Sequence, residues 1–158
     1  MFRVSDSLEN RRARIQRSID DGESAIAFIL AAADLERTVR RAIIALAAGP
    51  TKEVRETIEK KYKTIGNYED GWRTLVEVTG RPGLREVVGN WDAVKKAFQT
   101  RNEIIHGKRA TLSREHVTEK IEVILNATAE VTNFAEKYEV NLMARMNVRR
   151  KPADESSS

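Results

Sequence analysis

The stretch that decides the fold is residues 23–48, which read ESAIAFILAAADLERTVRRAIIALAA. Apolar residues recur in it at alternating intervals of four and three, the spacing that puts side chains on one face of an α-helix. The positions on that face are Phe28, Ala32, Leu35, Val39, Ala42 and Leu46. Gly49-Pro50 follows and ends the helix. We therefore predict a long helix that forms the centre of the core.

The polar face of this central helix carries Glu36 and Arg40, one helical turn apart. We interpret them as structural, although carboxylates on a central helix can also line a site. A first helix is expected over 7–20, with Arg11 on its solvated face. A third helix is expected to begin with Thr51 as its N-cap and to end at Gly66-Asn67.

Glycines and a proline interrupt residues 68–89, which favours one or two short helices over 72–78 and 84–88. Asn90 is expected to cap a further helix that Gly107 ends. Its buried face is expected to carry Trp91, Val94, Phe98 and Ile105. The last helix begins at Ser113 and keeps heptad spacing through Leu142. The fold class is therefore all-α, an up-and-down bundle of four to five helices, with one domain over 1–151 and a short disordered tail over 152–158.

The amino-acid composition of the chain excludes several classes of protein. The chain has 158 residues, 41% of them hydrophobic and 33% charged, and no cysteine. Disulfide scaffolds and thiolate metal sites are thereby excluded, and a cytoplasmic protein without a membrane segment is expected. The net charge is +4 and the pI is near 9.5. This balance permits a polyanionic partner but by itself favours a solvated surface of mixed charge.

No cofactor is expected, because the sequence has no phosphate-binding glycine loop and no dinucleotide fingerprint. A metal site is also not expected, since the two histidines have no second histidine at ligand spacing. Serine and thiol nucleophile arrangements are missing as well.

Candidate chemistry is concentrated in residues 101–107, which read RNEIIHG. On a helix with 100° per residue, Arg101, Asn102 and His106 bracket the apolar stripe, whereas Glu103 points away. Arg101 and His106 lie about 7.5 Å apart along the axis, so both can reach one cleft. An arginine, an amide and an imidazole are suited to binding and cleaving a phosphodiester.

This segment resembles the R-x4-6-H motif of the HEPN family, and the helical plan over 7–148 is similar as well. The resemblance implies a metal-independent endoribonuclease whose substrate is RNA, with two protomers of a homodimer bringing both motifs into one cleft. His106 would transfer protons, Arg101 would stabilise charge on the phosphorane, and Asn102 would orient the phosphate or the imidazole. Such nucleases are typically toxins of toxin–antitoxin or phage-defence systems, which implies an antitoxin partner, for example of nucleotidyltransferase type.

Several alternatives stay open beside this interpretation. Lys108 and Arg109 either extend the positive rim toward RNA or are solvated bystanders. Arg109 and His116 form a second match to the motif, which we discount because it straddles a loop and a helix start. The protein can also be a non-catalytic HEPN-like module that binds nucleotides or a partner. Finally, Arg101 and His106 can merely satisfy the end of a helix.

Overall fold

The computed structural model describes residues 7–107 and 113–153, and all of its regular structure is helical. The four longest helices are α1 (Leu8–Asp20), α2 (Ser24–Leu46), α6 (Trp91–Ile105) and α7 (Arg114–Glu136). The shorter elements are α3 (Thr51–Lys61), α4 (Ile65–Leu75), the 3₁₀-helix η1 (Glu77–Thr79) and α5 (Leu84–Val87). The all-α prediction is confirmed. The expected number of four to five helices is wrong, because the described part of the chain contains seven α-helices.

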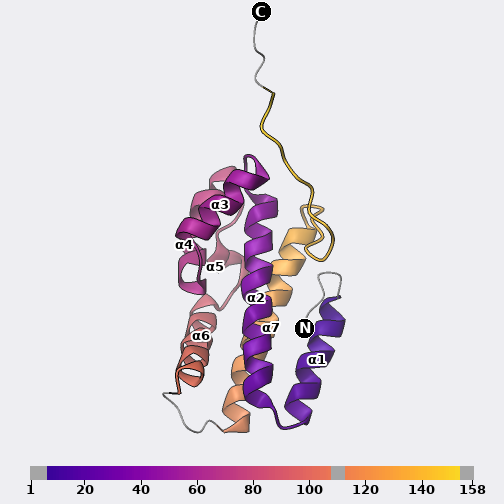
Figure 1. The fold of residues 1–158 in the computed structure, drawn as a ribbon, viewed down its shortest axis with the longest axis vertical. Coiled ribbons are helices and arrows are strands. Elements are labelled where there is room, and N and C mark those ends of the chain that lie inside the picture. Colours follow the sequence, from indigo (N-terminus) through magenta and orange to yellow (C-terminus); the bar gives the residue numbers. More distant parts are fainter. Residues whose placement is uncertain (1–6, 108–112, 154–158) are drawn as a thin grey trace, which may run out of the picture.

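Helices α2 and α7 form the centre of the molecule and lie side by side along their lengths (Figure 1). Both have 23 residues, and both run in the same direction. Helix α1 packs on one side of this pair and α6 on the other, each running the opposite way (Figure 1). Helices α3, α4 and α5 gather near the end of the bundle where α2 stops. The last turn of α6 therefore lies at the opposite end, near the start of α2.

The core consists mainly of the facing stripes of α2 and α7. All six positions predicted for the buried face of α2 are buried, and on α7 the predicted stripe is buried from Val117 to Ala135. Several α2 core positions are alanines, including Ala31 and Ala32, whose small side chains permit close approach of a neighbouring helix. The buried Thr128 hydroxyl donates to the Ile124 carbonyl at 3.0 Å, so its burial leaves no unmet hydrogen bond.

A buried ion pair joins α1 to α2. The Arg11 side chain is 1% exposed, and its Nη1 donates to Asp34 Oδ1, a carboxylate that is 2% exposed. Arg11 Nη2 also donates to Met143 Sδ at 2.9 Å. Burial raises the pKa of Asp34, while the positive charges of Arg11 and Arg37 act against that rise. The placement of Arg11 on a solvated face was therefore wrong.

The segment after α2 departs from the predicted third helix. That helix ends at Lys61, and α4 begins at Ile65, so Gly66 lies in the first turn of a new helix rather than ending the old one. Thr51 is the first helical residue and not the N-cap, which is Pro50. The Thr51 hydroxyl instead accepts the backbone N–H of Arg149 at 2.9 Å, a contact with the far end of the chain.

Gly71 lies inside α4, where the sequence suggested an interruption before a short helix over 72–78. A Cβ at Gly71 would stand 3.0 Å from Tyr62 Cγ. Glycine is therefore used here for the close approach of the Tyr62 ring and not to break the helix.

Helix α7 ends at Glu136 instead of continuing to Leu142. Glu139 then has φ 61°, a left-handed conformation that turns the chain. Leu142 is still completely buried, because the segment after α7 folds back onto the core. Arg41 of α2 holds this segment by donating to the carbonyls of Leu142 at 2.7 Å and Ala144 at 2.5 Å. Of the predicted tail, residues 152 and 153 are exposed and carry no helix or strand, and 154–158 lie outside the described residues.

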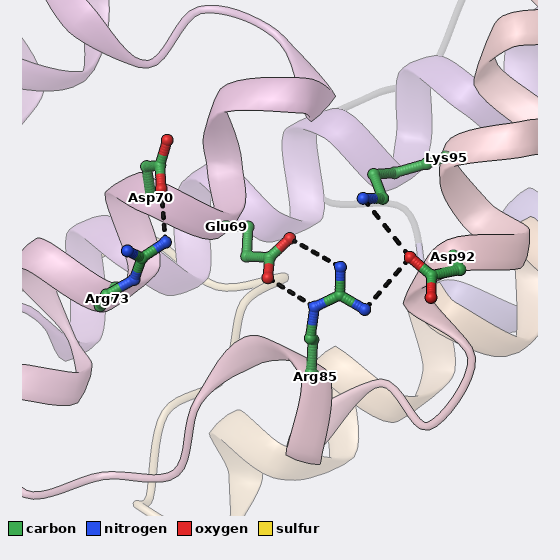
Figure 2. Close-up of polar contacts among 6 residues, drawn as sticks. All are labelled: Glu69, Asp70, Arg73, Arg85, Asp92 and Lys95. Atoms are coloured by element: carbon green, nitrogen blue, oxygen red, sulfur yellow. Dashed lines mark hydrogen bonds and ion pairs between the residues drawn. The ribbon is translucent and has the colours of Figure 1, made fainter.

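An exposed ion-pair network connects the short helices to α6 (Figure 2). Arg85 of α5 donates to Glu69 of α4 at 2.5 Å and to Asp92 of α6 at 3.1 Å. Lys95 lies 3.4 Å from the same Asp92 carboxylate. Hydrogen bonds from Arg85 and Lys95 lower the pKa of Asp92, so the carboxylate is ionised at neutral pH. The network orients α5 between its neighbours, although solvent screening keeps its energy small.

Within the described ranges, no helix combines the length and the apolar character needed to cross a bilayer.

Candidate functional site

The last turns of α6 carry the predicted site, and Arg101 makes side-chain contacts with three neighbouring residues. Its Nε and Nη2 both donate to Asn102 Oδ1, at 3.2 and 2.9 Å. Its Cζ lies 4.9 Å from the centre of the Phe98 ring, so the guanidinium stacks on an aromatic residue of its own helix. Its Nη1 is 3.7 Å from Glu36 Oε1 of α2. With 19% of its side chain exposed, Arg101 is oriented from three sides but still reaches solvent.

Glu36 is the residue of this site whose role the sequence left undecided. Its side chain is 28% exposed, and burial raises the pKa of its carboxyl group, while Arg101 opposes the rise. Tyr68 of α4 is 3% exposed. The pKa of its phenol is raised by burial and by the charge of Glu36. Glu36 thus connects α6 to the outer face of α2, and its i, i+4 pairing with Arg40 was the only sequence signal that pointed to it.

His106 is the C-cap of α6, as expected from Gly107, which follows with φ 65°. The His106 backbone N–H donates to the Asn102 carbonyl at 3.0 Å, and its side chain is exposed. Glycine permits this left-handed helix ending at little steric cost. No hydrogen bond or ion pair joins the side chains of Arg101 and His106. The structure therefore brings Arg101 and Asn102 together and places His106 in solvent at the helix end.

We predicted that Ile105 would lie on the buried face of α6. This prediction is wrong, because the residue is 52% exposed. Ile26 and Ile29 near the start of α2 are 50% and 39% exposed. On α2, Ile29 lies two turns before Glu36 on the same face, and on α6, Ile105 lies one turn after Arg101. Because α2 and α6 run in opposite directions, the start of α2 and the last turn of α6 lie toward the same end of the bundle (Figure 1). We call Ile26, Ile29 and Ile105 the apolar patch.

The remaining sequence candidates lie in or beside the segment between α6 and α7. Lys108 and Arg109 lie outside the described residues. His116 is half-buried in the first turn of α7, where its backbone N–H donates to the capping hydroxyl of Ser113 at 3.2 Å. Ser113 was predicted to begin the last helix, and it is the N-cap of α7, which starts one residue later at Arg114. His116 takes part in the start of that helix.

No group of three or more His, Asp or Glu side chains in the described part of the chain is arranged to hold a metal ion. The polar groups at the end of α6 are a guanidinium, an amide and an exposed imidazole, which offer positive charge and hydrogen bonding.

Compared with models of protein families, with curated proteins and with solved structures, the chain gives no match.

Proposed function

We propose that this chain is a metal-independent endoribonuclease of the HEPN type that acts as the toxin of a toxin–antitoxin or phage-defence system. The observation that carries the proposal is the arrangement at the end of α6. There a stacked, hydrogen-bonded Arg101 and its partner Asn102 lie within about one and a half helical turns of an exposed imidazole, His106. These groups supply the charge, the orienting amide and the proton carrier that phosphodiester cleavage uses.

In the proposed reaction, the 2′-hydroxyl of the RNA attacks the adjacent phosphorus. His106 accepts the hydroxyl proton as the O2′–P bond forms, and the P–O5′ bond breaks. A second imidazole, from the partner protomer, or a water molecule gives a proton to the leaving 5′-oxygen. The products are a 2′,3′-cyclic phosphate and a 5′-hydroxyl end. Arg101 stabilises the negative charge of the phosphorane through its planar fork of donors.

The contacts of Arg101 support a role in binding phosphate. Asn102 and Phe98 hold the guanidinium in one plane, which reduces the entropy lost when it grips an oxyanion. Its contact with Glu36, at 3.7 Å, is longer than a charge-assisted hydrogen bond. A phosphate with two accessible oxygens can therefore displace the Glu36 carboxylate and take over Nη1.

Dimerisation is part of the proposal, because one chain contributes one imidazole from this motif. The apolar patch exposes three large side chains to solvent: Ile105 belongs to the motif itself, and Ile26 and Ile29 lie on the first turns of α2, toward the same end of the bundle. Pairing two copies through this patch would bury it and bring two motifs close together. Light scattering at micromolar concentration is expected to give about twice the chain mass of 17.9 kDa.

The decisive experiment is RNA cleavage in excess EDTA. The purified protein is expected to cut RNA, and His106→Ala is expected to be slower by on the order of 10²–10⁴, the usual contribution of a positioned acid or base. His116→Ala is the matched control and should cut at the wild-type rate. Cutting that disappears with EDTA and returns with magnesium would refute the mechanism. A dead His116→Ala beside a fully active His106→Ala would show that the other Arg–His pair is the site.

A non-catalytic HEPN-like module that binds nucleotides or a partner is the second candidate. The pairing of Arg101 with Asn102 and Glu36, and the absence of a side-chain contact between Arg101 and His106, favour it. It predicts that RNA or nucleotide binds with the same dependence on Arg101 but that no cyclic-phosphate product appears.

A further inference from the structure

A groove of about 500 Å³ lies on the outer face of α2, between this helix and α3. Five basic side chains line it, from α2, α3 and the segment that follows α3. They are Arg37, Arg40, Arg41, Arg55 and Lys63. We call this the basic groove. Glu36 and Glu59 are its acidic lining residues, so positive charge predominates.

The basic side chains in the groove crowd one another. Burial lowers the pKa of Arg41, and the positive charges of Arg37, Arg55 and Arg11 lower it further. Glu59 offsets part of this charge through an exposed pair with Arg40 at 2.9 Å. Like charges held this close repel one another, and a bound anion would relieve the repulsion.

One basic side chain of the groove is preorganised by its hydrogen bonds. Arg41 donates from Nε to the Leu142 carbonyl at 2.7 Å and from Nη2 to the Ala144 carbonyl at 2.5 Å. These bonds fix the guanidinium at the junction of α2 and the chain segment after α7. An anion that binds beside Arg41 therefore loses little side-chain entropy.

The groove is continuous with the site on α6. Glu36 lines the groove and also contacts Arg101 at 3.7 Å, so the same carboxylate borders both. Arg40 and Arg41 follow Glu36 along α2 by about 6–8 Å, little more than one helical turn. A chain of phosphates that displaces Glu36 from Arg101 can thus continue along α2 to the basic side chains of the groove.

We propose that the basic groove binds the phosphate backbone of the RNA strand next to the phosphate held by Arg101. This inference rests on the proposed function, because Arg101 sets the direction of the strand. Guanidinium groups are suited to phosphate oxygens by their planar donor forks, and backbone contacts of this kind position RNA without reading its sequence.

The test measures binding of fluorescent single-stranded RNA by anisotropy, with the full chain in the His106→Ala background so that the RNA stays intact. The groove variant combines Arg40→Gln, Arg55→Gln and Lys63→Gln and leaves Arg41 in place. If each lost charge removes one phosphate contact, the salt slope falls by about 2 and the affinity at 0.1 M salt falls by about 100-fold.

The matched control combines Lys60→Gln, Lys61→Gln and Arg73→Gln, three exposed residues on α3 and α4 that do not line the groove. The net charge changes equally, so a loss of affinity below about threefold is expected from long-range screening alone. Equal weakening by both triple variants would overturn the inference. Tight binding of a polyglutamate peptide would also overturn the inference, if its affinity equals that of RNA and requires the same three residues. The groove would then be suited to an acidic protein.

The outcomes separate this inference from the proposed function. For the cleavage assay the three groove substitutions are made in the chain that keeps His106. Cleavage by that chain at the wild-type rate, together with unchanged RNA affinity in the His106→Ala background, would refute the groove and leave the nuclease intact. A second outcome is that the wild-type chain never cuts RNA, whereas RNA binding is weakened by the groove substitutions. This outcome would refute the nuclease activity and support phosphate binding in the groove.

Discussion

The buried pair of Arg11 and Asp34 offers the sharpest test of the fold, because both side chains are nearly inaccessible to solvent, at 1% and 2% exposure. The perturbation is Arg11→Met, which keeps an unbranched apolar stem and removes the charge. It leaves the Asp34 carboxylate buried beside α1 without its closest cation. Removing one partner of a buried pair costs about 3–5 kcal/mol, because the remaining charge loses its compensation.

This loss is large compared with the stability of the whole chain. A domain of this kind has an unfolding free energy of about 5–15 kcal/mol. For a urea dependence of about 2 kcal/mol per molar, a loss of about 4 kcal/mol moves the midpoint of unfolding down by about 2 M. Equilibrium urea unfolding followed by circular dichroism measures that midpoint.

Two companion variants keep the prediction falsifiable. Arg40→Met breaks the exposed pair with Glu59, whose side chains are 39% and 59% exposed, and should cost about 0–1 kcal/mol. The double variant Arg11→Met with Asp34→Leu removes both charges, so most of the lost stability should return. If Arg11→Met costs no more than Arg40→Met, the reasoning about burial is wrong.

The pH dependence of Arg11→Met provides an independent check. Burial already raises the pKa of Asp34 above 3.8 in the folded chain, so folding takes up a proton as the pH falls through that pKa. A carboxyl group with a raised folded-state pKa destabilises the fold when ionised, and this penalty disappears on protonation. Without Arg11 the pKa should rise further. The deficit of Arg11→Met relative to wild type is therefore expected to shrink as the pH falls from neutral through the raised pKa of Asp34, measured as the difference in urea midpoint.

Four further changes test the site and its surroundings. Glu36→Gln removes the carboxylate that competes with phosphate for Arg101, so RNA affinity measured by anisotropy should rise by up to about fivefold. Arg101→Lys keeps the charge but loses the planar fork, and the single-turnover cleavage rate should fall by about 10²-fold. Ile105→Glu places a charge in the apolar patch and should shift light scattering at micromolar concentration from the dimer to the monomer mass. Gly71→Ala puts a Cβ at 3.0 Å from Tyr62 Cγ and should lower the unfolding free energy by about 1–3 kcal/mol in urea titrations.

Local signals predicted the helices well where each element has its own start and stop. Asn90 and Ser113 cap α6 and α7 through their side chains, and Gly107 takes the left-handed conformation that ends α6. These features depend on a few neighbouring residues and are therefore visible in the sequence. The break after Lys61 was not predicted, because nothing in its local sequence resembles a helix stop.

Predictions of which side chains are buried failed at a few positions. Periodicity identifies the apolar stripe of a helix, but it does not show which parts of the stripe another element covers. Ile105 continues the stripe of α6 by spacing, yet half of its surface is exposed in the last turn of the helix. Arg11 was expected in solvent because arginine is rarely buried, yet the ion pair with Asp34 makes its burial tolerable. Leu142 is buried although α7 ends before it, since the chain folds back instead of continuing as a helix.

The sequence by itself determined that residues 23–48 contain a long buried helix and that Arg101, Asn102 and His106 lie at the C-terminal end of another helix. Both conclusions follow from the fixed rise and rotation of the α-helix, which relate residues only a few positions apart. The tertiary structure alone decided that Glu36 meets Arg101 and that Arg41 and Arg55 crowd into one groove. Contacts between residues far apart in the chain depend on how helices cross and pack, and no local periodicity records that geometry.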